Sequence, residues 1–394
     1  MIHVAIVGFG TVGSGTAEVL TKAAPRIREK VGEDISIKYI CDLRDFPDSP
    51  FRDRMIRDYH IALRDPDIKI IAEVMGGTRA AYELTREALS AGKSVVTSNK
   101  EVVALYGPEL LSLAKEKGVS YLFEASVGGG IPLLSPMTAC LAANEIYAVH
   151  GILNGTCNYI LTQMEKYGTD FSVALRDAQQ KGYAEKDPVN DIEGYDTRRK
   201  ICILTAMMTG CLPSAEAVET RGITEVSITD IKAAKDHGLK IKLLGSAKKS
   251  GDGVCVTVAP VCVPSNHPLY NVTDVFNAVV AKGDATGDVM FFGKGAGMLP
   301  TASAVVADII DAALHGGKTS YPAWRHAGDG FTVKDPAPAR YLIRTTSPEI
   351  AGKLLSPGGK TAEAEDGSLS LVTLPLTPEA LCCPEIIAQY KIVE

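Results

Sequence analysis

The feature that most constrains the fold is the hexapeptide GFGTVG, which follows the apolar run MIHVAIV at the start of the chain. An apolar strand that ends in glycines and leads into a helical pattern, here TVGSGTAEVL, is typical of a dinucleotide-binding βα turn. Gly8 permits the tight turn, Gly10 lets the backbone approach a pyrophosphate, and Gly13 lets helix and strand pack closely. Thr11 and Val12 complete the loop, whose N–H groups bind phosphate. The alternative is a glycine turn in an α/β protein that binds no nucleotide.

Up to about residue 123, short apolar runs alternate with helical patterns. This alternation predicts a doubly wound parallel sheet of the Rossmann type with crossover helices. The expected strands are HVAIVG, ISIKYIC, IKIIAEVM, KSVVTS and SYLFEAS. We therefore assign residues 1–130 to a dinucleotide-binding domain and expect residues 293–315, which contain ASAVVADIIDAAL, to pack back on it as a helix.

The pattern changes after residue 131 to longer helices, including FSVALRDAQQKGY and TRRKICILTAMMTG, with strands KIKLLGSA and GVCVTVAPVCV. These segments predict a second, α+β domain over residues 131–292. The stretch 316–339 has the Gly, Pro, Lys and Asp content of a linker. Residues 340–394 form a short C-terminal segment with strand-like RYLIRTT and LSLVTLPL.

Charge and composition exclude several classes of protein. The chain has 394 residues with 41 basic and 47 acidic side chains dispersed along it, so we expect a small-molecule partner and no nucleic acid or membrane. The apolar N-terminal run is too short for a signal peptide or a spanning helix, which favours a cytoplasmic protein. The nine cysteines lack CxxC spacing and are expected as reduced core residues.

The end of the second expected strand carries two residues that bear on the choice of cofactor. Asp42 lies where an acidic residue accepts the ribose hydroxyls of NAD. Arg44 follows two residues later, where a guanidinium can hold the 2′-phosphate of NADP. Arg44 as a solvated loop charge is the alternative. The sequence therefore leaves NAD and NADP open.

Five further motifs, in order and at matching spacing with GFGTVG, carry a resemblance to a known family. They are VVTSNKEVVA, FEASVGGGIPLL, GILNGTCNYILTQM, GYAEKDPVNDIEGYDTRRK and GKGAGMLPTASAVVAD. Together the six motifs, within residues 1–315, resemble the homoserine dehydrogenase family. The resemblance implies an NAD(P)-dependent interconversion of L-homoserine and L-aspartate 4-semialdehyde in threonine, methionine and isoleucine biosynthesis. It also implies a homodimer in which the second domain supplies catalysis and dimerisation.

The resemblance implies that Lys200 is a catalytic lysine and that Asp196 and Glu185 bind substrate. Oxidation of an alcohol needs a base for the hydroxyl proton, and an amino-acid substrate needs partners for its ammonium and carboxylate. Asp196 and Lys200 are spaced i, i+4 and so share one helix face. An exposed helix pair is the alternative that spacing alone favours. Lys100, after the strand KSVVTS, matches a family lysine near nicotinamide and substrate and is a second catalytic candidate.

Other substrate candidates lie in the same motifs. Thr156 and Asn154 offer groups suited to the substrate carboxylate, with helix capping as the alternative. Tyr183 is a candidate contact through its hydroxyl, with packing as the alternative. Asp191 and Glu193 are expected to support the loop.

The resemblance also implies cofactor contacts at Gly76 and Gly297. It places a structural Na+ or K+ ion at Glu124 and at the carbonyls of the glycine-rich stretch that follows, those of Val127, Gly129 and Ile131. Without the resemblance, this stretch is a glycine hinge between domains.

Residues 340–394 resemble an incomplete or diverged ACT-type module, because RYLIRTTSPEIAGKL is similar to its opening strand and helix. A tail that stabilises a dimer is the alternative. For the whole chain, the competing functions are a dehydrogenase of another small amino or hydroxy acid and a catalytically silent regulator that binds nucleotide or amino acid. The presence of both Lys100 and Lys200 argues against the silent regulator.

Overall fold

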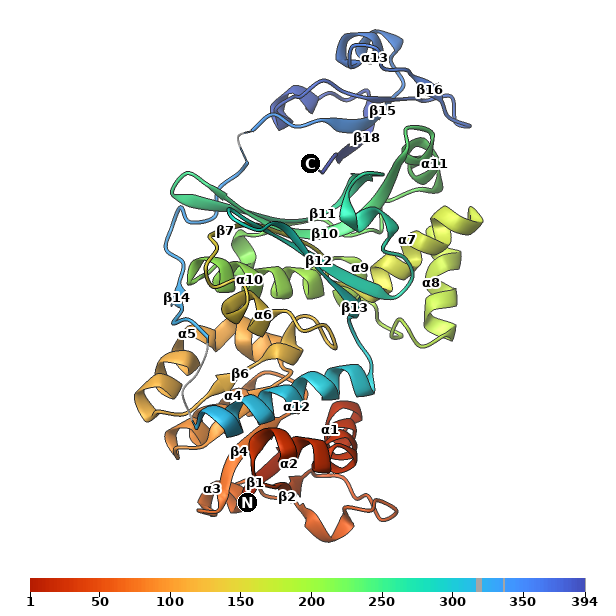
Figure 1. Cartoon of the computed structure of the whole chain (residues 1–394). Coiled ribbons are helices and arrows are strands. Elements are labelled where there is room, and N and C mark those ends of the chain that lie inside the picture. Colours follow the sequence, from red (N-terminus) through yellow and green to blue (C-terminus); the bar gives the residue numbers. More distant parts are fainter. Residues whose placement is uncertain (317–320, 336, 394) are drawn as a thin grey trace. The chain divides into compact units, whose positions relative to one another are not determined.

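The computed structural model describes residues 1–316, 321–335 and 337–393 (Figure 1). The predicted linker and the C-terminal segment each include residues outside this set, which are 317–320, 336 and 394. The chain forms two compact units, the first made of residues 1–145, 202–214 and 293–328, the second of residues 146–201, 215–292 and 329–394. These units are defined by contacts within the chain, and the domain bounds given above stay predictions.

The first unit is built on a six-stranded parallel sheet with the order β3-β2-β1-β4-β5-β6. This is the strand order of the Rossmann fold. The strands are β1 Ile2–Val7, β2 Ile35–Cys41, β3 Met55–Ile56, β4 Ile68–Glu73, β5 Ser94–Thr97 and β6 Tyr121–Leu122. All four residues of β5 and five of the six in β4 are buried, as expected where helices cover both faces of a sheet. The predicted fold class and all five expected strands are confirmed, whereas the short edge strand β3 was not predicted.

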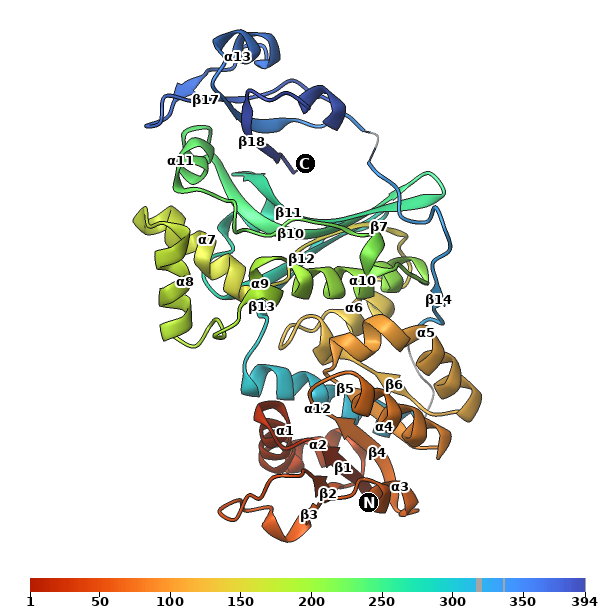
Figure 2. The same ribbon diagram turned by 180° about the vertical axis from the view of Figure 1, so that it is seen from behind.

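Helices cover both faces of this sheet. The helices of this unit are α1 Thr11–Lys22, α2 Ala24–Val31, α3 His60–Arg64, α4 Arg79–Ser90, α5 Lys100–Lys117, α6 Leu134–Ala139 and α12 Met298–His315. α1 and α12 stand before the sheet in Figure 1, and α4 and α5 stand before it in Figure 2. α12 is long and apolar enough to cross a membrane by length and composition. It packs against α1, β4 and β5, so its apolar face belongs to the core of this unit.

The second unit contains a mixed sheet with the order β13-β12-β7-β10-β11-β9. Its strands are β7 Ile146–Ile152, β9 Glu219–Thr220, β10 Leu239–Ser250, β11 Gly253–Pro264, β12 Phe276–Gly283 and β13 Gly287–Lys294, of which β13 ends in the first unit. β10 and β11 form the predicted pair of strands, joined by a tight turn, and pair over their whole length. β7, β12 and β13 were not predicted. The associated helices are α7 Gly155–Tyr167, α8 Phe171–Gln180, α9 Val189–Ile192, α10 Tyr195–Thr209 and α11 Ile228–Asp236, of which α10 belongs to the first unit from Cys202 onward.

The C-terminal part of the second unit is a four-stranded antiparallel sheet with the order β16-β17-β15-β18. In chain order it runs β15 Tyr341–Thr345, α13 Pro348–Leu354, β16 Ala362–Glu363, β17 Leu369–Val372, the 3₁₀ turn η5 Pro378–Leu381 and β18 Ile386–Lys391. This follows a βαββαβ pattern in which one 3₁₀ turn replaces the second helix. The buried Arg344 of β15 forms ion pairs with Asp230 of α11 at 2.8 Å and with Asp366 at 2.7 Å, which fixes this sheet to α11.

The remaining short elements are β8 Cys211–Leu212, β14 Arg325–His326, η1 Arg52–Arg54, η2 Glu124–Ser126, η3 Ala215–Ala217 and η4 Pro268–Asn271. Five cysteines are buried as predicted: Cys41, Cys157, Cys202, Cys211 and Cys262. Cys140 and Cys382 are exposed, so the prediction of core positions is wrong for these two, which follow the ends of the short elements α6 and η5.

Candidate active site

The glycines of GFGTVG form a tight loop between β1 and α1. Gly8 has a φ of +99°, and a Cβ there would lie 2.7 Å from the carbonyl oxygen of Val74. A Cβ on Gly13 would lie only 2.0 Å from the Gly8 carbonyl oxygen. α1 begins at Thr11 without a side-chain cap and without an acidic residue in its first turn, so its first N–H groups are suited to phosphate. Any larger side chain at Gly8 or Gly13 would collide with backbone, so both positions require glycine, as the dinucleotide-binding fingerprint does.

Asp42 and Arg44 form one ion pair beside this loop. The Asp42 carboxylate accepts hydrogen bonds from the Phe9 N–H at 2.7 Å, the Arg44 N–H at 2.9 Å and the Arg44 Nε at 3.0 Å. Arg44, foremost among these groups, holds the pKa of Asp42 well below its usual range. The guanidinium lies over the ring of Phe46, and one of its nitrogens is 3.7 Å from the position of a Cβ on Gly10. The carboxylate is therefore already satisfied, while the guanidinium remains exposed at the loop.

Lys100 is the first residue of α5, directly after β5. Asn99 caps this helix by accepting the Val102 N–H at 3.2 Å, and its amide donates to the Gly77 carbonyl at 2.8 Å. β1, β4 and β5 run parallel, so their carboxyl ends meet at one edge of the sheet. Lys100 and Gly76 thus share this edge with the phosphate loop, and a Cβ on Gly76 would have open space around it.

Gly297 precedes α12 and has a φ of +119°. The helix begins close to α1, since a Cβ on Gly15 would lie 2.9 Å from Met298 Cγ. The preceding chain packs against the glycine-rich turn, where the Gly130 N–H donates to the Lys294 carbonyl at 3.1 Å. A Cβ on Gly129 would lie 2.3 Å from the Gly295 carbonyl oxygen. The two glycine motifs are therefore one packed structure.

The Glu124 carboxylate is buried and caps the start of α6. It accepts the N–H groups of Leu133 at 2.6 Å, Leu134 at 2.8 Å and Ser135 at 2.7 Å. Its own N–H donates to the buried carboxyl of Asp308, whose pKa is raised by burial and by the Glu124 charge. Three N–H groups already occupy this carboxylate, and the ion site that the resemblance implies at Glu124 stays a prediction. A cation at this turn is left with backbone carbonyls.

Asp196 and Lys200 form a buried ion pair on α10. Lys200 Nζ lies 2.8 Å from the Asp196 carboxylate, and the two side chains are only 11% and 9% exposed. Nζ also donates to the Leu153 carbonyl at 2.8 Å. The burial is inconsistent with the alternative of an exposed surface pair.

Asn154 joins helix capping and the charged pair in one side chain. Its Oδ1 accepts the Cys157 N–H at 2.8 Å and so caps α7. Its Nδ2 donates to Asp191 at 2.7 Å and to Asp196 at 3.1 Å. The Cys157 thiol donates to the Asp191 carbonyl at 3.1 Å, so Asp191 supports the loop as expected. The capping role, which was the alternative for Asn154, is confirmed, and its role in substrate binding stays a prediction.

Thr156, Tyr183 and Glu185 lie around the loop that follows α8. The Thr156 hydroxyl donates to the Tyr183 carbonyl at 2.6 Å, and the Tyr183 ring packs on Tyr159 with a centroid distance of 4.9 Å. Tyr183 is nevertheless exposed, as is Glu185, whose carbonyl accepts the Gln179 amide at 3.1 Å. The backbone of this loop is held by α7 and α8, and the Tyr183 and Glu185 side chains are accessible to solvent.

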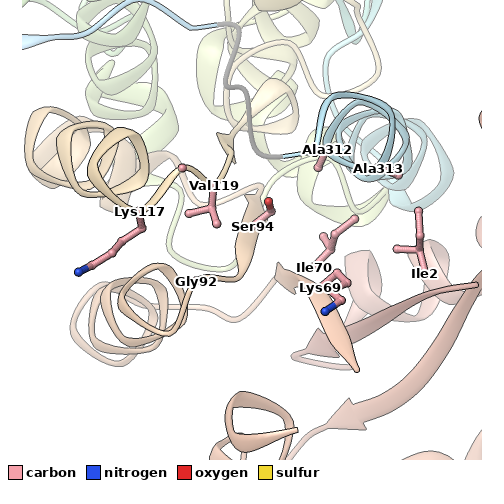
Figure 3. Close-up of a pocket in the computed structure, with 11 residues that line it drawn as sticks. Ile2, Lys69, Ile70, Gly92, Ser94, Lys117, Val119, Ala312 and Ala313 are labelled. Carbon is pink, nitrogen blue, oxygen red and sulfur yellow. The ribbon is translucent and has the colours of Figure 1, made fainter. Parts of the chain in front are cut away.

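A pocket of about 340 Å³ lies in the first unit at the opposite edge of its sheet (Figure 3). Its lining includes Ile2 and Ser94, the first residues of β1 and β5, with Ala312 and Ala313 of α12 on another side. The amino ends of the strands face it, so it is separate from the phosphate loop.

Two family models match the chain: the NAD-binding domain of homoserine dehydrogenase over residues 8–124 and homoserine dehydrogenase over residues 132–310. The homoserine dehydrogenase of Neisseria gonorrhoeae is 41% identical over 319 residues, which are 79% of this chain and 72% of that protein. That of Synechocystis sp. is 42% identical over 319 residues, 79% of this chain and 73% of the relative.

Solved structures extend the similarity to the C-terminal sheet. A homoserine dehydrogenase from Thiobacillus denitrificans aligns with a TM-score of 0.88 and 32% identity, covering 100% of this chain and 98% of that one. A hyperthermophilic archaeal homoserine dehydrogenase in complex with NADPH aligns with a TM-score of 0.68 and 29% identity, covering 82% of this chain and 99% of that one. Because the predicted motifs, the two matching family models and these relatives all agree, the chain belongs to the homoserine dehydrogenase family.

Proposed function

We propose that the chain catalyses the NAD(P)-dependent interconversion of L-homoserine and L-aspartate 4-semialdehyde, as a step of threonine, methionine and isoleucine biosynthesis. The observation that carries this proposal is the buried Asp196–Lys200 pair, in a member of a family named for this activity. A buried ion pair costs desolvation energy, so its presence on α10 calls for a functional explanation. Family membership favours this function over a silent regulator.

Each residue of the site has a part in the proposed reaction. The nicotinamide ring, when bound, accepts or supplies the hydride. As a neutral amine Lys200 takes the hydroxyl proton in the oxidation, and as an ammonium group held by Asp196 it returns that proton in the reduction. Lys100 polarises the reacting oxygen or shares the proton transfer. The substrate's ammonium and carboxylate bind to side chains at the start of α7, in the loop after α8 and on α10, namely Asn154, Thr156, Tyr183, Glu185 and Asp196.

The test is the initial rate of nicotinamide reduction with L-homoserine, run in parallel with NAD and NADP. Turnover with homoserine is expected. Faster turnover of another amino or hydroxy acid would assign the site to that substrate. Tight cofactor binding without turnover of any of them would indicate a regulator.

The proposal includes a preference for NADP over NAD. The Asp42 carboxylate, which would accept the ribose hydroxyls of NAD, already accepts N–H groups from Phe9 and Arg44. The Arg44 side chain is 64% exposed next to the phosphate loop, where the guanidinium N–H groups that do not bond Asp42 suit a 2′-phosphate. The archaeal relative with NADPH bound is consistent with this preference.

A structural Na+ or K+ ion is proposed at the glycine-rich turn, with the carbonyl oxygens of Glu124, Val127, Gly129 and Ile131 as ligands. Hard cations favour such oxygens. The measurement is the melting temperature in NaCl, KCl and choline chloride at equal ionic strength. Stabilisation by Na+ or K+ over choline supports the ion, and equal melting temperatures contradict it.

The proposed assembly is a homodimer in the cytoplasm, in which the sheet of the second unit pairs with its symmetry mate. Its long strands β10 and β11 offer an extended surface for such a contact. Sedimentation at working concentration tests the assembly, and a profile with monomer alone would contradict it.

A further inference from the structure

Glu73, the last residue of β4, has a buried carboxyl group at the carboxyl edge of the first sheet. It is 0% exposed and lies between Val7 of β1 and Thr97 of β5. One carboxylate oxygen accepts the Thr97 hydroxyl at 2.5 Å, and the other accepts the Met75 N–H at 2.9 Å. Both of these donors are neutral. Burial of a carboxyl group among neutral partners costs stability. A carboxyl group kept at such a place suggests a role in function.

The hydrogen bonds of Glu73 continue into the segment that carries Lys100. The Thr97 hydroxyl, while donating to Glu73, accepts the Asn99 N–H at 2.9 Å. Asn99 then caps α5 at Val102, so it determines where this helix begins. Two hydrogen bonds thus lead from the Glu73 carboxylate to the residue before Lys100.

Its second oxygen fixes the other loop at this edge of the sheet. Met75 follows β4, and its nitrogen would lie 2.9 Å from a Cβ on Gly8. The Asn99 amide also donates to the Gly77 carbonyl at 2.8 Å, which ties the end of this loop to the start of α5. The loops after β4 and β5 are therefore joined to each other and to Glu73, beside the phosphate loop.

We propose that Glu73 is a positioning residue of the dehydrogenase, whose carboxylate holds Lys100 and the backbone beside the phosphate loop in their working geometry. The inference rests on the proposed function, because Lys100 matters only where a reaction takes place. Glu73 itself touches neither substrate nor cofactor in this scheme. It acts through Thr97, Asn99 and Met75.

The charge on Glu73, and with it the strength of its hydrogen bonds, depends on pH. Burial raises the pKa of Glu73 to about 7, against the opposing effect of the hydrogen bonds from Thr97, Met75 and Asn99. Those groups are uncharged, and Val7 on the β1 side is apolar. Tyr121 of β6 is a titratable group that feels the Glu73 charge, and burial, followed by that charge, raises the pKa of Tyr121 well above its usual value. Protonation of Glu73 weakens its two accepted hydrogen bonds, because bonds to a charged acceptor are the stronger ones.

The experiment compares Glu73→Gln and Thr97→Val with Thr85→Val. Thr85 on α4 is fully buried, and its hydroxyl has no hydrogen-bond partner among the described residues, so its replacement by Val removes no hydrogen bond. kcat, KM for homoserine, and the NADPH dissociation constant from fluorescence are measured for each, with kcat followed from pH 5.5 to 9. Thr97→Val isolates the hydrogen bond should Glu73→Gln fail to fold.

We expect Thr97→Val to lower kcat at least about tenfold, the loss typical of a hydrogen bond to a charged group, and to shift the acid limb of the kcat profile upward. Glu73→Gln should remove that limb, and Thr85→Val should change neither quantity. Profiles of unchanged shape in both variants, whatever their stability, would overturn the proposal. Absence of homoserine turnover in the wild-type chain would refute the proposed function instead. In that case the NADPH affinities still test the hydrogen bonds of Glu73. A lower affinity in Thr97→Val than in Thr85→Val would support their positioning role, and equal affinities would overturn it.

Discussion

The two units present different kinds of groups to their ligands. At the carboxyl edge of the first sheet, the groups suited to a ligand are backbone N–H groups, made accessible because Gly8 and Gly13 lack side chains. On α7 and α10 of the second unit, they are the side chains of Asn154, Asp196 and Lys200, which hold one another by hydrogen bonds and an ion pair. The first arrangement depends on close backbone packing and the second on buried charge. They should therefore fail in different ways when altered.

The largest effect is expected from Lys200→Ala. Loss of the proposed base should lower kcat about 10³-fold or more, while the NADPH dissociation constant stays within about twofold because the phosphate loop is untouched. Lys22→Ala is the matched control, since Lys22 also forms an i, i+4 ion pair but its side chain is 76% exposed. A Lys200→Ala enzyme with a wild-type rate would remove this lysine from the mechanism.

These two lysine pairs also show what the sequence could not predict. Glu18–Lys22 and Asp196–Lys200 have the same spacing, and only the folded chain separates an exposed pair from a buried one. The family motifs, and not the spacing, pointed to Lys200. The glycine spacing, by contrast, predicted the first βα turn directly, because a tight turn between strand and helix has few solutions.

Glu73 and Lys242 are two of the buried ionisable residues that the sequence analysis missed, for a related reason. Glu73 stands inside the apolar run IKIIAEVM, and a carboxylate at that place was a signal that could have been read. Lys242 gave no such signal, since KIKLLGSA alternates like a strand with one polar face. Lys240 in the same strand pairs with Glu165 at 3.0 Å, whereas Lys242 is fully buried. Which of the two lysines is enclosed depends on the loop after η4, which is distant in sequence.

The second prediction concerns these buried groups and stability. Lys242 donates to the Val272 carbonyl at 2.8 Å and to Asn158 at 3.2 Å, and burial lowers its pKa from 10.5 to about 8. The unfolded chain then binds more protons than the folded chain between these values, so the free energy of unfolding should rise by up to about 3 kcal/mol from pH 8 to 10.5. Urea denaturation across this range measures it.

Lys242→Met should flatten that rise, and Lys22→Met should leave it. A rise of wild-type size in Lys242→Met would assign the stability change to another group.

Glu73 in the first unit should change the free energy of unfolding in the opposite direction, because its pKa is raised from 4.5 to about 7. There the folded chain binds more protons, so the free energy of unfolding should fall as pH rises through that range, by a similar amount.

The third prediction tests the backbone packing of the first unit. In Gly13→Ala, the new methyl group would meet the Gly8 carbonyl oxygen at 2.0 Å, so the loop must move. We expect the free energy of unfolding to fall by about 1–3 kcal/mol and NADPH affinity to fall more than tenfold. Gly352→Ala on α13, where a Cβ meets nothing within 4 Å, is the control. Unchanged NADPH affinity in Gly13→Ala would show that this close approach does not shape the site.

The smallest effect is expected from Arg44→Ala, which removes an exposed charged side chain beside the phosphate loop of the first unit. Its removal should weaken NADP binding about tenfold, the worth of a partly exposed charge-assisted contact. NAD binding should strengthen or stay, because the Asp42 carboxylate is freed to accept the ribose hydroxyls. Arg28→Ala, at an exposed arginine that pairs with Asp34 on the same unit, controls for the lost charge. Equal weakening of NAD and NADP would mean that Arg44 supports the loop as a whole and does not select between the two cofactors through its charge.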